Sequence, residues 1–200
     1  MKFDNTAIFL DRDGTINEEL EFISNPDEVN LIPRAAEAIR AANKLGFKVI
    51  VITNQSGIAR GLIKEEELKI VHNKLVELLE LEGAHLDAIY FCPHHPDIGD
   101  NRYRILCDCR KPNSGMLKYA QEEFNIDLQK SYVVGDRIID LQTANSVGAH
   151  PILVLTGYGK NQLEILKSEN IQVDYIAKDL YEAIQFIIKS TQQFLKNEND

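Results

Sequence analysis

Short apolar segments alternate with longer amphipathic segments along the chain. The run AIFL at 7–10 is typical of a buried strand, and so is the β-branched run KVIVIT at 48–53. Later apolar runs predict further strands, namely DAIYFC at 87–92, SYVVGD at 131–136, PILVLTG at 151–157 and DYIA at 174–177.

Between these strands, apolar residues recur with the spacing of an amphipathic helix. One helix is predicted from Pro33 to Gly46, and a longer one, with acidic residues in its first turn, over 64–83. Ser114 is a candidate cap for a helix that runs to Phe124. The remaining segments are predicted as helices after 136, near 161–169 and from 179, and as loops at 18–31 and 93–112.

The alternation of strands and helices predicts an α/β fold with a doubly wound, mostly parallel sheet and helices on both faces. We expect one domain over 1–190, with an inserted loop at 92–112, and a frayed tail over 191–200. Ligands bind such sheets beyond the carboxyl ends of the strands, so polar residues at those ends are the candidates for a site.

Composition narrows the class of protein. The 200 residues are 44% hydrophobic and 26% charged, which is typical of a globular domain. The formal net charge is −9 and no large Lys/Arg cluster occurs, so we expect no nucleic-acid partner, and an anionic substrate would need local cations. No apolar run approaches the length that spans a bilayer, so we expect a cytoplasmic protein without a membrane partner.

Acidic residues follow two of the predicted strands. The segment FLDRDGTIN places Asp11 and Asp13 two residues apart, and Asp136 ends the strand at 131–136. An acidic pair in an exposed turn is the plain alternative, but the matching strand ends favour a divalent cation that offsets the repulsion. Mg²⁺ suits such oxygen ligands together with a substrate phosphate. One carboxylate could then attack phosphorus, and a second could act as general acid and base.

Two further polar residues fit a phosphate site. Thr53, in TNQSG, offers a hydroxyl followed by backbone N–H groups, and Gly57 allows close backbone approach. Lys111 would place a positive charge beside the transition state. The alternatives are a threonine that caps a turn and a lysine that is solvated.

The three cysteines lie close together in the sequence and share one histidine. Cys92, His94, Cys107 and Cys109 form a C-x-H…C-x-C pattern, which favours a closed structural zinc site over a disulfide framework or buried free thiols. His95 is the competing imidazole. Arg110 and Lys111 directly follow the last ligand, so zinc would order a loop that carries two cations.

These motifs together resemble the haloacid dehalogenase (HAD) superfamily of phosphatases. The resemblance is carried by DRDGT at 11–15, Thr53, Lys111 and GDRIID at 135–140. It implies a HAD-like fold, with Asp11 as nucleophile and Asp13 as general acid and base. Members often carry a large cap domain, but the connections of this chain are too short for one, so we expect none. The resemblance also implies Mg²⁺ held by Asp11, Asp13 through its backbone carbonyl, and Asp136. Thr53 and Lys111 would stabilise the phosphoryl group, and Asp140 would orient Lys111 or a metal-bound water.

Within the superfamily, TNQSGIARG, CPHHP and CDCRKP resemble the branch that removes the C7 phosphate of a heptose bisphosphate. Many members of that branch have Gly-Tyr where this chain has Glu21 and Phe22, and often Lys where it has Arg137. The substrate-binding residues that the resemblance implies are Glu19, Phe22, Asn54, Gln55, Ser56, Arg110 and Arg137.

We therefore expect a Mg²⁺-dependent phosphatase with a small sugar bisphosphate as substrate. Histidinol phosphate or another small phosphomonoester is the alternative substrate. A non-catalytic phospho-acceptor domain is the alternative of another class, although it would not need an acid two residues beyond its acceptor. No long exposed apolar strip is evident, so we expect a monomer.

Overall fold

The structure is a computed structural model that describes residue 3 and residues 5–197. Its strands are β1 (Ala7–Leu10), β2 (Lys48–Asn54), β3 (Ala88–Cys92), β4 (Tyr132–Gly135), β5 (His150–Val154) and β6 (Tyr175–Ala177). Its α-helices are α1 (Ala35–Leu45), α2 (Glu65–Leu81), α3 (Gly115–Phe124), α4 (Ile138–Asn145), α5 (Gly159–Ser168) and α6 (Leu180–Asn197). Short 3-10 helices lie at Pro26–Glu28 and Leu128–Lys130.

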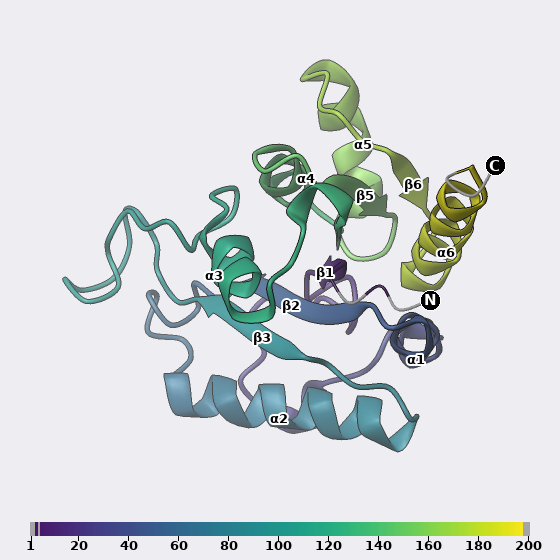
Figure 1. Cartoon of the computed structure of the whole chain (residues 1–200). Coiled ribbons are helices and arrows are strands. Elements are labelled where there is room, and N and C mark those ends of the chain that lie inside the picture. Colours follow the sequence, from purple (N-terminus) through teal and green to yellow (C-terminus); the bar gives the residue numbers. More distant parts are fainter. Residues whose placement is uncertain (1–2, 4, 198–200) are drawn as a thin grey trace.

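The strands form one parallel sheet in the order β3-β2-β1-β4-β5-β6. The chain builds outward from β1 to β3 and then returns to β4 beside β1, as Figure 1 shows. The strand order therefore reverses between β1 and β4, and ligands bind at such a switch point in open α/β sheets. The predicted doubly wound parallel fold is confirmed.

Alternate residues of the central strand face opposite sides of the sheet. Ile8 and Leu10 pack into the core formed with α1, α2 and α6, whereas Ala7 and Phe9 pack into the core formed with α3 (Figure 1). Both faces of the sheet are covered, which explains why its strands are almost continuously apolar.

Local backbone geometry sets the ends of the first helix. Arg34 adopts a left-handed conformation with φ of 66°, so α1 begins after it rather than at Pro33. Gly46 ends the helix with φ of 89°, and its N–H donates to the carbonyls of Ala42 and Asn43. The predicted capping by Ser114 is wrong, because its side chain makes no capping hydrogen bond to α3.

The connections after β1 and β3 are long loops. Segments 11–34 and 93–114 contain no α-helix or strand among the described residues, so they form loops rather than a cap domain. β5 ends at Val154, earlier than the predicted 157, and the residues after it form a turn. Helix α6 continues to Asn197, through most of the predicted tail, and 198–200 lie outside the described residues. No helix in the described part of the chain is long and apolar enough to cross a membrane.

Candidate active site

The predicted catalytic residues meet at the carboxyl edge of the sheet. Asp11 and Asp13 follow β1, Thr53 lies near the end of β2, and Lys111 comes from the loop between β3 and α3. All of these residues line one cavity of about 440 Å³. Of the predicted substrate-binding residues, the same cavity is lined by Glu19, Phe22, Asn54, Ser56, Arg110 and Arg137.

Three buried carboxylates gather behind the cavity. Oxygen atoms of Asp11, Asp136 and Asp140 all lie within 4.8 Å of one another. Burial, together with the neighbouring carboxylates, raises the pKa of Asp11 to about 7, against the opposing charge of Lys111, and raises the pKa of Asp136 to about 8. A divalent cation would favour their ionised forms, and Oδ1 of Asp136 has no hydrogen-bond partner among the described residues. The cluster therefore fits Mg²⁺.

Lys111 lies beside two of these carboxylates. Its Nζ is 2.7 Å from Oδ1 of Asp11 and 2.6 Å from Oδ1 of Asp140, and it donates to the carbonyl of Ile52. Burial opposes the charged form, but the two carboxylates outweigh it and raise the pKa of Lys111. Asn54 exchanges two hydrogen bonds of 3.0 Å with the Lys111 backbone. The ammonium group is thus charged and fixed beside the carboxylate of Asp11.

Both carboxylate oxygens of Asp13 accept hydrogen bonds from neighbouring side chains. Arg12 donates to both of its oxygens, at 2.9 and 2.7 Å, Asn17 donates at 2.9 Å and Gln55 donates at 2.9 Å. Gln55 also donates to the hydroxyl of Thr53. Gln55, predicted to bind substrate, therefore lies behind the cavity wall and orients Asp13 and Thr53.

The rim of the cavity is rich in guanidinium groups. Arg137 lies 3.5 Å from Glu19 and stacks over the ring of Tyr158, with 4.1 Å from Cζ to the centroid. Arg110 donates to the carbonyl of His94 at 2.9 Å. Arg60 also lines this cavity.

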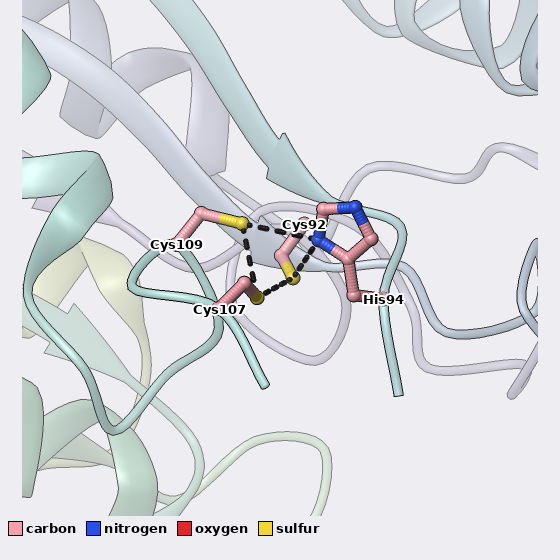
Figure 2. A group of neighbouring side chains, drawn as sticks. All are labelled: Cys92, His94, Cys107 and Cys109. Atoms are coloured by element: carbon pink, nitrogen blue, oxygen red, sulfur yellow. Dashed lines mark hydrogen bonds between the residues drawn. The ribbon is translucent and has the colours of Figure 1, made fainter. Parts of the chain in front are cut away.

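A second polar cluster lies in the loop after β3. Cys92, His94, Cys107 and Cys109 direct their sulfur and nitrogen atoms toward one point (Figure 2). The Sγ–Sγ distances of 3.3 and 3.5 Å are close to the ~3.8 Å edge of a tetrahedral zinc site with thiolate ligands. Nδ1 of His94 lies 3.4 Å from the sulfur of Cys109. This arrangement is compatible with zinc.

His95 lies outside this cluster. Its Nδ1 accepts the backbone N–H groups of Asp97 and Ile98, at 3.1 and 3.2 Å. The ring therefore stabilises a turn of the loop, and His94 alone supplies an imidazole to the cysteines.

Some residues of the site gave no sequence signal. Arg12 lies between the two predicted aspartates and is only 1% exposed, yet nothing in its spacing indicated burial. Tyr158 is isolated in sequence, and only the turn that carries it places it at the cavity. Arg60 lies within the motif TNQSGIARG, but no role was predicted for it. The one available hint for Arg12 was its place between two predicted site residues, two positions after a buried strand.

A parallel sheet that gathers aspartates, a threonine and a lysine at its carboxyl edge defines the class of HAD-like hydrolases. A family model described as HAD-hydrolase-like matches residues 108–183. The D-glycero-beta-D-manno-heptose-1,7-bisphosphate 7-phosphatase of Photorhabdus laumondii is 40% identical, over 92% of this chain and 97% of its own length. The enzyme of that name from Escherichia coli K12 is 43% identical, over 76% of this chain and 80% of its own length.

A solved structure agrees with these relatives. The D,D-heptose 1,7-bisphosphate phosphatase of B. bronchiseptica, complexed with magnesium and phosphate, superposes with a TM-score of 0.81 and 34% identity. The match covers 92% of this chain and 99% of that one. The chain belongs to the D-glycero-D-manno-heptose-1,7-bisphosphate 7-phosphatase family of HAD-like phosphatases.

Proposed function

We propose that the chain removes the C7 phosphate of D-glycero-D-manno-heptose 1,7-bisphosphate in a Mg²⁺-dependent reaction. The observation that carries the proposal is the convergence of Asp11, Asp13, Thr53 and Lys111 on one cavity backed by buried carboxylates. The Photorhabdus laumondii relative and the structural neighbour are named for this activity, and the matches cover 97% and 99% of their lengths.

The first step is transfer of the phosphoryl group to Asp11. A carboxylate oxygen of Asp11 attacks phosphorus, the bond from phosphorus to the C7 oxygen breaks, and Asp13 gives its proton to that oxygen. Lys111, held at Asp11, offsets the charge of the phosphoryl oxygens, and Thr53 supplies a hydroxyl beside them. The products of this step are heptose 1-phosphate and an aspartyl-phosphate.

The second step restores the carboxylate. Asp13 takes a proton from a water molecule, the water oxygen bonds to phosphorus, and the bond from phosphorus to Asp11 breaks. Arg12, Asn17 and Gln55 hold the Asp13 carboxylate in place for both steps. Inorganic phosphate is then released.

Asp11, Asp136 and the backbone carbonyl of Asp13 would hold Mg²⁺, which supplies charge neutralisation for nucleophile and phosphate. Asp140 lies within the same group of carboxylates but is paired with Lys111, so we assign it the orientation of that lysine. Zinc, held by Cys92, His94, Cys107 and Cys109, would be structural.

The rim favours a substrate with a second anionic group. Among the described residues, Arg60 and Arg110 line the cavity and neither has a carboxylate ion-pair partner. A second phosphate would be attracted to these guanidiniums, whereas the ammonium group of histidinol phosphate would be repelled. The product would supply the heptose of an ADP- or GDP-activated precursor, as for lipopolysaccharide.

The test is a comparison of kcat/KM for both anomers of the heptose bisphosphate, histidinol phosphate and an aryl phosphate. We expect a heptose bisphosphate to be the best substrate. The preferred anomer should show whether the product supplies the ADP- or the GDP-activated heptose. Arg110→Ala should lower kcat/KM for the bisphosphate more than for the aryl phosphate. A preference for histidinol phosphate would overturn the proposed substrate.

A further inference from the structure

The turn after β5, residues 155–158, contacts the segments that follow β1 and β4 and carry the carboxylates. The backbone N–H of Tyr158 donates to Oδ2 of Asp136 at 2.7 Å. The hydroxyl of Thr156 donates to the carbonyl of Gly14 at 2.6 Å, which ties the turn to the loop after β1. Nothing in the proposed reaction yet uses these contacts.

Two glycines enclose the Asp136 carboxylate. A Cβ atom added at Gly157 or at Gly14 would lie well inside 3.0 Å of Oδ2 of Asp136, a separation that real Cβ atoms do not show. Gly157 also has φ of +50°, in the left-handed region. The two backbones therefore leave no space for the carboxylate to turn, and a side chain at either position would displace it.

The result is that the two oxygens of Asp136 have different surroundings. Oδ2 is taken by the N–H of Tyr158, while Oδ1 is buried without a hydrogen-bond partner among the described residues. An unpartnered buried carboxylate oxygen is costly unless a ligand satisfies it. The turn thus leaves Oδ1 free to bind a cation together with the neighbouring carboxylates of Asp11 and Asp140.

The side chain of Tyr158 lies at the cavity in which substrate would bind. The ring of Tyr158 lines the cavity and lies under the guanidinium of Arg137, with 4.1 Å from Cζ to the centroid. Arg137 directly follows Asp136 in sequence, so one turn residue contacts two consecutive residues of the site through separate groups. Its backbone orients Asp136, and its ring orients Arg137.

We propose that Gly157 and Tyr158 are positioning residues: the turn fixes the metal-facing oxygen of Asp136 and the direction of Arg137 toward substrate. The proposal rests on the assignment of Asp136 as a Mg²⁺ ligand in the proposed function. Two separate effects are expected. The backbone N–H of Tyr158 should increase the affinity for the metal ion, and its ring should increase the affinity for substrate.

The metal effect is tested with Mn²⁺ alone, by calorimetric titration of the full chain without substrate. Gly157→Ala should weaken Mn²⁺ binding by ~10- to 100-fold, as loss of an outer-shell partner does in other metal sites. The matched control is Gly148→Ala, which also has positive φ, at +73°, but only Gln129 near its added Cβ, at 3.7 Å. Both alanine variants should lower the stability of the fold, because alanine is strained at positive φ, but the control should keep the Mn²⁺ affinity of the parent.

If Gly157→Ala does not fold, a comparison of Tyr158→Pro with Tyr158→Leu decides the same question, because both variants lose the ring and only the proline variant also loses the N–H that donates to Asp136. Unchanged Mn²⁺ affinity in whichever variant folds would overturn the metal part of the proposal. Because this titration uses no substrate, it reports on the turn even where the heptose assignment fails.

The substrate effect is tested by separating KM from kcat. Tyr158→Leu should raise KM for the heptose bisphosphate about threefold, the scale of a lost cation–π contact, with a smaller change in kcat and in Mn²⁺ affinity. Tyr158→Phe keeps the ring and should restore most of the KM. A KM for Tyr158→Leu equal to that of the parent enzyme, or no rescue by phenylalanine, would overturn the role of the ring.

Discussion

His72 is a buried histidine on α2 that the proposed reaction does not use. It packs edge-on against Phe91, with ring centroids 5.8 Å apart. Burial, reinforced by the charge of Arg12, lowers the pKa of His72 to about 3. The imidazole is therefore neutral in the folded protein at neutral pH.

This shift predicts an acid-dependent loss of stability. In the unfolded chain the pKa of His72 is ~6.5, so its contribution is complete above that pH and declines as the pH falls toward 3. The slope is at most about 1.4 kcal/mol per pH unit. We expect His72→Leu to lose this slope, measured as the free energy of unfolding in urea at pH 7, 6 and 5.

The matched control for this titration is His85→Leu, since His85 is exposed. The control should follow the parent protein across the pH range. Parallel curves for His72→Leu and the parent would show that His72 is not held neutral by the fold.

At the scale of the element, the loop at 93–114, for which we propose a zinc site, holds its two cations in different ways. The guanidinium of Arg110 donates to the carbonyl of His94, inside the cysteine cluster. Lys111 is held instead by Asn54 and by the carboxylates of Asp11 and Asp140. Loss of zinc should therefore affect Arg110 more than Lys111.

We expect Cys107→Ser to lose zinc and to raise KM by about tenfold at saturating Mg²⁺, with a smaller fall in kcat. Metal analysis and steady-state kinetics measure the two effects. His95→Gln is the matched control, because this neighbouring imidazole lies outside the cluster and its variant should keep zinc. Lost zinc with unchanged KM and kcat would contradict the link between the loop and the site.

The elements were predictable where the pattern was strong. β1, β2 and α2 lie close to their predicted bounds, because continuous apolar runs, helical spacing and an acidic first turn are local signals. β5 ends before its predicted end, since Thr156 and Gly157 leave the sheet to contact the loop after β1. The roles of Arg12 and Tyr158 depend on contacts between distant segments, which periodicity does not encode.

At the scale of the whole molecule, the carboxylate cluster joins β1, β4 and α4 at one point. Asp11 and Asp140 share the ammonium of Lys111, and the carboxylate of Asp136 lies beside them, so the metal-free protein keeps acidic groups buried together. Mg²⁺ should therefore stabilise the fold as well as support the reaction.

The effect of Mg²⁺ on Tm should depend on pH. The pKa values of Asp11 and Asp136, about 7 and 8, are raised above those of the unfolded chain. The metal-free protein therefore gains stability as the pH falls from above 8, while Mg²⁺ must displace protons and binds less well. We expect a larger Mg²⁺-induced rise in Tm at pH 8.5 than at pH 6, measured by calorimetry.

Asp136→Asn is the control for this measurement and should lose most of the Mg²⁺-induced rise. An equal or larger rise for the parent protein at pH 6 would mean that the cation binds elsewhere.

In the proposed reaction the phosphoryl group passes through Asp11, and trapping it there is the most direct test. Asp13→Asn should slow both formation of the intermediate, because it removes the acid for the leaving oxygen, and its hydrolysis, because it removes the group that activates water, so samples are taken over a time course. The variant is mixed with Mg²⁺ and heptose bisphosphate, quenched in acid, reduced with borohydride and mapped by peptide mass spectrometry. We predict that Asp11 alone is converted to homoserine, and only when substrate is present. Substrate turnover without modification of Asp11, or with modification of another residue, would contradict the account.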